Sequence, residues 1–94
     1  MIRVLLERRV AEGMEDAFDE VLRDVRQGAV DFPGYISGES LRDPTNPHHY
    51  VVISTWRSQR DWDAWAHSEE RERFQVRMTP LLEETEKVTL LEPI

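Results

Sequence analysis

The sequence predicts an α+β fold of the ferredoxin-like type, with the order β-α-β-β-α-β and a four-stranded antiparallel sheet. Segments rich in Val, Ile and Leu, which favour strands, alternate with segments whose apolar residues recur every three or four positions, as on one face of a helix. The two middle strand segments are separated by a turn of a few residues, which is typical of an antiparallel hairpin. The 94 residues are expected to form one domain, residues 1–94.

The first strand is expected at Ile2–Val10, and a helix follows it. Gly13 precedes this helix, and acidic residues near its start suit the positive end of the helix dipole. Gly28 and Pro33 bracket its end. Its apolar face is made of residues three and four positions apart: Met14, Ala17, Phe18, Val21, Leu22 and Val25.

The middle of the chain predicts a hairpin. Gly34–Asp43 is expected to form the second strand, with Gly38 at a position typical of a bulge. Pro44–Pro47 is rich in chain-breaking residues and forms the turn, and His48–Trp56 forms the third strand. The short turn makes the second and third strands antiparallel neighbours.

The second helical region is expected to be broken in two. Ser58 is an N-cap with Asp61 three positions later, as in a capping box, and Ser68 is a second N-cap. The last strand is expected at Glu86–Ile94. An apolar stripe follows the second N-cap: Phe74, Met78, Leu81 and Leu82.

The net charge and the composition of the chain argue against several classes of partner. Acidic residues outnumber basic ones 19 to 12, and the formal net charge of -7 repels phosphate backbones, so no nucleic-acid partner is expected. The chain has no cysteine and therefore no disulfide, thiolate nucleophile or cysteine-ligated metal. The N-terminal segment is apolar over only a few residues, which is unlike a signal peptide or a membrane span. We expect a cytoplasmic protein with no membrane partner.

Both faces of the predicted sheet carry apolar residues. In the first strand Val4 and Leu6 lie on one face and Leu5 on the other, and the third strand shows the same mixture. A sheet with one wet face would alternate apolar and polar residues more cleanly. The helices can cover one face only, so we infer a homodimer in which the other faces of two sheets pack together.

The stretch "FPGYISGESLRDPTNPHHYVVISTWRSQRDWDAWAHSEER" resembles the central region of the antibiotic biosynthesis monooxygenase family. In that family Pro-Gly-aromatic opens the second strand, Thr-Trp ends the third, and a tryptophan follows before Ser-x-Glu. The N-terminal "VLLERRVAEGMEDAF" is also similar. The resemblance implies a dimeric α+β barrel and relatives that include quinol and polyketide oxygenases, haem-degrading enzymes and an isomerase branch.

The haem-degrading branch of that family has three marker residues. They are an asparagine in the first strand, a tryptophan in the second helical region and a haem-ligating histidine nine or ten residues later. The corresponding positions here are Glu7, Trp65, and Phe74 or Gln75, so only the tryptophan matches. Neither Phe nor Gln supplies the imidazole that ligates the iron. Haem degradation in that manner is therefore not expected.

The resemblance implies a cofactor-independent monooxygenase that acts on a small aromatic substrate of hydroquinone or polyketide type, with molecular oxygen as co-substrate. The sequence has no glycine-rich phosphate cradle, so it indicates no nucleotide cofactor. His48 and His49 are adjacent in a strand and point to opposite faces, so no metal site is expected there. The residues expected to bind the substrate are Leu5, Phe18, Trp62, Phe74 and Met78.

Three residues are candidates for the chemistry. The indole of Trp65 can stack on a flat aromatic substrate and donate a hydrogen bond. His67 is a candidate base, because imidazole side chains in general titrate near neutrality. Glu7 is a second candidate base if its face of the strand meets the helices, because burial would raise its pKa. Each also has a purely structural interpretation: core packing for the tryptophan, a solvated helix end for His67 and an ion pair for Glu7.

Two other functions remain open at this level. The protein can be a non-catalytic small-molecule binding module of the same fold, because no complete catalytic set is recognisable. It can also be a relative that binds or degrades haem with altered ligands, such as His67.

Overall fold

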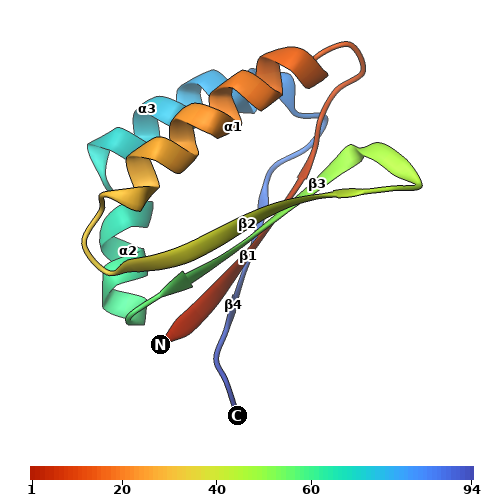
Figure 1. Ribbon diagram of the computed structural model, residues 1–94. Coiled ribbons are helices and arrows are strands. Elements are labelled where there is room, and N and C mark those ends of the chain that lie inside the picture. The colour runs from red at the N-terminus through yellow and green to blue at the C-terminus, as the bar shows by residue number, and fades with distance from the viewer.

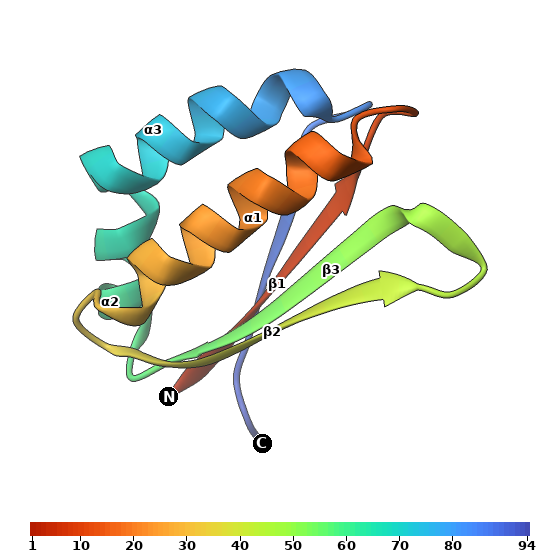
Figure 2. The ribbon, with the colours of Figure 1, turned by 45° about the horizontal axis from the view of Figure 1, so that its top comes forward.

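The computed structural model describes all 94 residues, and it confirms the ferredoxin-like α+β fold. The four strands form one antiparallel sheet in the order β2-β3-β1-β4, and the helices cover one of its faces (Figures 1 and 2). The elements are, in chain order, β1 (Ile2–Arg9), α1 (Glu15–Val30), β2 (Tyr35–Asp43), β3 (Asn46–Trp56), α2 (Gln59–Ala66), α3 (Glu69–Met78), a 3-10 turn η1 (Thr79–Leu81) and β4 (Lys87–Leu91).

The ends of all four strands differ from the predicted ends, and β2 begins at Tyr35 one residue later than expected. β1 stops at Arg9, and Val10 instead forms an isolated bridge with Leu82. β3 begins two residues earlier than expected, because Asp43 Oδ1 accepts a hydrogen bond of 2.8 Å from Thr45 N and closes a tighter turn. β4 covers only Lys87–Leu91, because its partners on β1 run only from Arg3 to Glu7.

The register of β1 and β3 fixes which side chains face the helices. Directly opposed residues share a face of the sheet, and the opposed pairs Leu6–Val52 and Arg8–Tyr50 are buried or half-buried under the helices. Leu5 and the residues at odd positions of β1 therefore lie on the face that no helix covers, here called the open face. We define the other face as the helix face.

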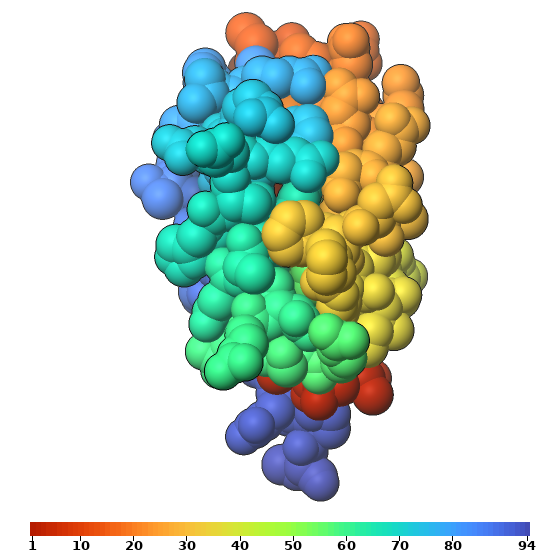
Figure 3. Space-filling view, turned by 90° about the vertical axis from the view of Figure 1, so that its left-hand side faces the viewer, coloured from red at the N-terminus to blue at the C-terminus, as the bar shows by residue number.

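Two apolar clusters form the core between the sheet and the helices. The first is centred on Trp56, with Trp62 and Trp65 of α2 packed against it. The second contains Phe18 of α1 and Met78 of α3. Figure 3 looks onto the side formed by α1, α2 and α3, where these helices pack against one another and the C-terminal residues project beyond the rest. None of the helices is long and apolar enough to cross a membrane.

The N-cap predicted at Ser58 is confirmed, and Asp61 also anchors the loop before β2. Ser58 Oγ accepts a hydrogen bond of 3.2 Å from Asp61 N, and Arg57 Nε donates one of 3.0 Å to the Asp61 carboxylate. Gly34 has φ +90° and lies so close that a Cβ there would be 2.3 Å from Asp61. The hydrogen bond from Arg57, together with that from Ser58, holds the pKa of Asp61 below its usual value.

The low pKa of Asp61 gives a prediction for the acid side of the stability curve. The unfolded chain takes up the Asp61 proton at a higher pH than the folded chain. The stabilisation is therefore complete above the unfolded pKa of about 3.9 and is lost as the pH falls through the lower folded value. Chemical denaturation followed between pH 5 and pH 2 should show a shallower loss of stability in Asp61→Asn. Asp63→Asn, on the same helix with no side-chain hydrogen bond, is the control and should follow the wild type.

Candidate functional site

A cavity of about 490 Å³, including the part open to solvent, lies between the helix face of the sheet and helices α1 and α2. It is lined from the sheet by residues of β1, β2 and β3, and nine of its fifteen lining residues are hydrophobic. The cavity is the candidate site because it combines aromatic walls with a few polar groups.

All three tryptophans of the chain line this cavity. The rings of Trp56 and Trp65 are stacked, with centroids 6.3 Å apart and planes inclined by 24°. Trp62 meets Trp56 edge to face at 5.7 Å. Trp56 Nε1 donates a hydrogen bond of 3.0 Å to Ser54 Oγ, so its polar edge is satisfied within the protein. Such a wall offers a flat aromatic ligand both stacking and edge contacts.

A buried ionic network lies beneath the cavity, and Arg8 is the member that lines it; we call this network the floor. Arg8 is 3% exposed and donates from Nε to Glu86 Oε2 at 2.6 Å, with Nη2 2.5 Å from the same oxygen. Arg71 of α3 donates from Nη2 to Glu86 Oε1 at 2.9 Å, and its guanidinium also lies 5.4 Å from the ring centroid of Trp62. Burial lowers the pKa of Arg8, and its contact with Glu86 opposes that lowering. Arg8 nevertheless stays protonated near neutrality.

The rim of the cavity is formed by α1 and β2. Arg26 Nη2 donates a hydrogen bond of 3.1 Å to Ser40 Oγ and so connects the two elements. Tyr35 also lines the cavity, and its hydroxyl lies where a Cβ at Gly38 would be only 2.5 Å away. Gly38 is therefore needed for this placement of the phenol. Burial raises the pKa of Tyr35, while the positive charge of Arg26 lowers it.

The structure brings two of the predicted site residues to the cavity, Trp62 and Trp65. Phe18 and Met78 are instead fully buried in the second core cluster, away from the cavity lining. Phe74 packs between α1 and α3, where a Cβ at Gly28 would lie 3.0 Å from its ring. These three side chains hold the helices together and do not form the ligand space.

Leu5 and Glu7 lie on the open face, opposite to what their assigned roles require. The expectation depended on which of the two strand faces meets the helices, and a shift of one residue reverses that choice. Burial shows the answer: Val4, Leu6 and Arg8 are the buried residues of β1. A carboxylate at position 7 therefore does not point into the cavity.

His67 also lies outside the cavity. It is the C-terminal cap residue of α2, it is exposed, and its Nδ1 lies 2.8 Å from the carbonyl oxygen of Asp63. His48 is paired with Glu15 at 3.1 Å and His49 with Asp43 at 3.5 Å. None of the three histidines lines the cavity. The chain brings together no group of three His, Asp or Glu side chains that could hold a metal ion.

Sequence reasoning missed the ionic floor. A signal for Arg8 is present, because it occupies the strand position that continues Val4 and Leu6 on the apolar side. No such signal marks Glu86, which lies 78 residues away in the chain and reaches Arg8 only through the fold. The sequence marked Gly38, but its close approach to the Tyr35 hydroxyl appears only in the structure.

The ionic network gives a stability prediction. Glu86→Gln leaves Arg8 and Arg71 as buried like charges, and breaking a buried pair in this way costs about 3–5 kcal/mol. Glu84→Gln is the matched control, because Glu84 pairs with Arg9 at the surface, where an ion pair contributes about 1 kcal/mol or less. Guanidinium unfolding of both variants measures the difference. Equal losses of stability would show that the network does not hold the floor together.

Comparison with known proteins gives one family match and many similar structures. The sequence model of antibiotic biosynthesis monooxygenases (ABM) matches residues 1–77. Over 69 residues the chain is 29% identical to the 42.8 kDa protein in the whiE locus of Streptomyces coelicolor, and the matched stretch covers 73% of this chain but 17% of that protein.

The structural likenesses show the fold. A structure described as a possible antibiotic biosynthesis monooxygenase from Nitrosomonas europaea superimposes with a TM-score of 0.91 at 16% identity, covering 100% of this chain and 99% of that one. SnoaB, a cofactor-independent oxygenase from Streptomyces nogalater, gives a TM-score of 0.86 at 16% identity, covering 98% and 92%.

Proposed function

Because the chain belongs to the antibiotic biosynthesis monooxygenase family, we propose that it is a cofactor-independent monooxygenase that acts on a small aromatic substrate of hydroquinone or polyketide type. The observation that carries the proposal is the cavity with three tryptophans in its wall. The relation to SnoaB supports the absence of a cofactor requirement. The substrate class is part of the proposal.

The proposed reaction takes all its electrons from the substrate. In an anthrone-like substrate a ring methylene carbon loses both its hydrogens and becomes a carbonyl carbon. One atom of molecular oxygen becomes that carbonyl oxygen, and the other leaves as water with the two hydrogens. Loss of a proton first gives an electron-rich enolate or phenolate, which passes an electron to oxygen. The protein's task is to hold this anion in a dry aromatic space and to stabilise its charge.

The cavity residues take different parts in this proposal. Trp62 and Trp65 are the walls against which the ring of the substrate packs. Tyr35 stays protonated near neutrality, because burial raises its pKa, and it can donate a hydrogen bond to an oxygen of the substrate. Glu7 and His67 do not face the cavity, so the proton of the substrate leaves through water at the rim.

The proposal predicts oxygen uptake when protein treated with a chelator is given a panel of hydroquinones, naphthols and anthrone-like phenols. An oxygen electrode measures the rate, and mass spectrometry of the product formed under labelled oxygen should show one retained atom per turnover. Rates no higher than background for the whole panel would refute the proposal for those substrates.

Trp65→Phe should lower kcat/KM about three- to tenfold, because the smaller ring loses part of a stacking contact worth about 0.5–1.5 kcal/mol. Phe74→Leu is the control, since Phe74 packs between helices and does not line the cavity. It should leave kcat/KM within about twofold of the wild type. An unchanged kcat/KM in Trp65→Phe would show that Trp65 does not contact the substrate.

A second function is favoured by one observation. No imidazole lines the cavity, and the carboxylate of its acidic lining residue, Glu39, belongs by register to the open face, so no proton acceptor is built into the site. A binding module needs none. Quenching of tryptophan fluorescence by the same aromatic panel, without oxygen uptake, would identify this function.

We also propose that the protein is a homodimer through the open face of its sheet, the arrangement that gives the α+β barrel typical of this family. The open face carries half-exposed apolar residues on all four strands, among them Leu5, Leu41, Ile53 and Leu91. No helix covers this face of the sheet (Figure 1). A second copy would remove them from water.

Sedimentation velocity tests the dimer. The wild type should sediment at the mass of two chains, and Ile53→Asp should shift it to one chain, because a charge would then be buried in an apolar interface. Val76→Asp makes the same change at a residue of α3 that is 69% exposed, and it should remain dimeric. A folded monomeric wild type at micromolar concentration would contradict the interface.

A further inference from the structure

We propose that the cavity binds its ligand as an oxyanion, namely a phenolate, enolate or carboxylate on a flat aromatic ring, and that Arg8 is the residue that recognises it. This inference rests on the proposed function, because it assigns the ligand's charge at the same site. It is carried by one atom: Arg8 Nη1 is buried and has no hydrogen-bond partner, while Arg8 lines the cavity.

The charged side chains of the floor carry a net positive charge. Two guanidinium groups, Arg8 and Arg71, share a single carboxylate, Glu86. Both Glu86 oxygens are already used, since Oε2 accepts from Arg8 and Oε1 accepts from Arg71. The cluster therefore keeps one positive charge and one unused N–H donor group beneath an aromatic wall. Leaving such a group unpaired is costly, and an anionic oxygen is the partner that satisfies both needs.

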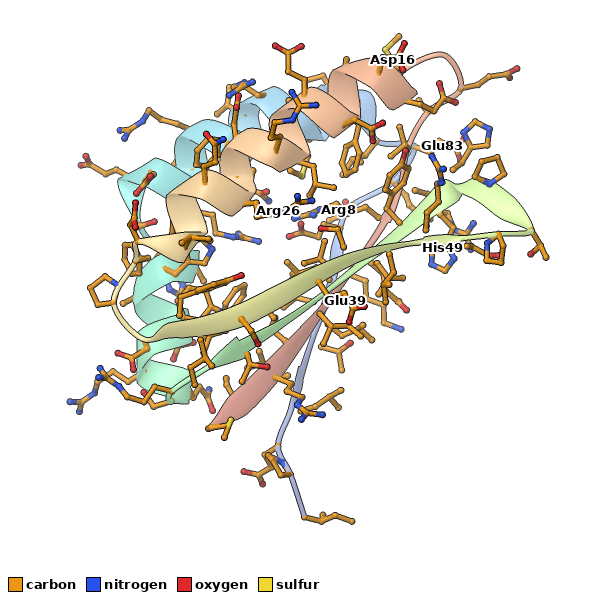
Figure 4. The ribbon with its side chains drawn as sticks, in the orientation of Figure 1. Arg8, Asp16, Arg26, Glu39, His49 and Glu83 are labelled. Carbon is orange, nitrogen blue, oxygen red and sulfur yellow. The ribbon has the colours of Figure 1, made fainter.

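The polar groups around Arg8 are engaged elsewhere. Gln75 of α3 reaches Glu86 at 3.5 Å, and Tyr50, opposite Arg8 on β3, donates its hydroxyl to Asp19 at 3.1 Å. Glu39 lines the cavity, but it is opposed to Ile53, so its side chain belongs to the open face; Figure 4 shows it on the sheet side away from α1. No second carboxylate on the helix face competes for Arg8.

A second positively charged side chain, Arg26, lies at the rim of the cavity. Figure 4 shows Arg26 and Arg8 pointing toward each other in the space between α1 and the sheet. Arg26 holds Ser40 across the rim at 3.1 Å, so a ligand reaches Arg8 when this bond opens. The chain as a whole carries a formal charge of -7, yet the charged side chains that face the cavity are both arginines. This local reversal of sign attracts anions to the site.

The probe for the test is 4-nitrophenol, whose phenolate form absorbs visible light, so the ionisation of the bound molecule is read directly. Binding beside Arg8 should lower its apparent pKa by about one unit or more relative to the free phenol. The phenolate should bind about tenfold or more tightly than 4-nitroanisole, which has the same ring but cannot ionise. 4-Nitrobenzoate shows whether a carboxylate is accepted as well.

Two variants locate the effect. Arg8→Met leaves Arg71 and Glu86 as a balanced pair, and it should abolish the pKa shift and the preference for the phenolate. Arg26→Met should reduce the preference only in part. Arg23→Met is the matched control: it removes the same charge from α1 at an exposed residue that does not line the cavity, and it should behave as the wild type.

Several results would overturn the inference. These are an unchanged or raised pKa for the bound phenol in the wild type, equal or absent binding of phenolate and anisole, or a full phenolate preference in Arg8→Met. The wild-type comparison stands even if Arg8→Met does not fold. None of these measurements involves turnover. A phenolate preference without oxygen uptake would therefore refute the monooxygenase and leave the oxyanion site intact.

Discussion

The rest of the structure depends on the buried ion pairs that Arg8 and Arg71 make with Glu86. They connect β1, α3 and the segment before β4, which are far apart in the chain. A charge buried in this way is tolerated only when its partners are fixed, so the network sets the distance between α3 and the sheet. The same arginine that joins these elements also lines the cavity between the sheet, α1 and α2.

The three tryptophans likewise belong both to the core and to the lining of the cavity. Trp56 extends from the sheet, and Trp62 and Trp65 extend from α2, so their mutual contacts join the two layers, and all three rings line the cavity. Arg71 lies over Trp62 and links the wall to the floor. Stability and binding thus use the same side chains, and residues that line the site cannot be exchanged without some cost to the fold.

Much of this architecture follows from local sequence patterns. The strand and helix order, the broken second helical region and the caps at Ser58 and Ser68 are all confirmed, because caps and apolar periodicity act over a few residues. The site was harder to predict. Trp62 and Trp65 do line the cavity, but the role of Glu7 depended on which strand face meets the helices, since strand alternation gives two equivalent sets and only the packing of helices chooses between them. His67 caps the end of α2, and the sequence did not show that this position lies outside the cavity. Glu86 depends on a contact across 78 positions that no short pattern encodes.

The most direct measurement of the central claim is a crystal structure of the protein with 4-nitrophenolate bound at a pH where the probe is ionised. The account predicts the ring against Trp62 and Trp65 and the phenolate oxygen about 2.7–2.9 Å from Arg8 Nη1, the distance of a charge-assisted hydrogen bond. A probe that fills the cavity with its oxygen turned toward the rim, or that binds outside the cavity, would contradict it.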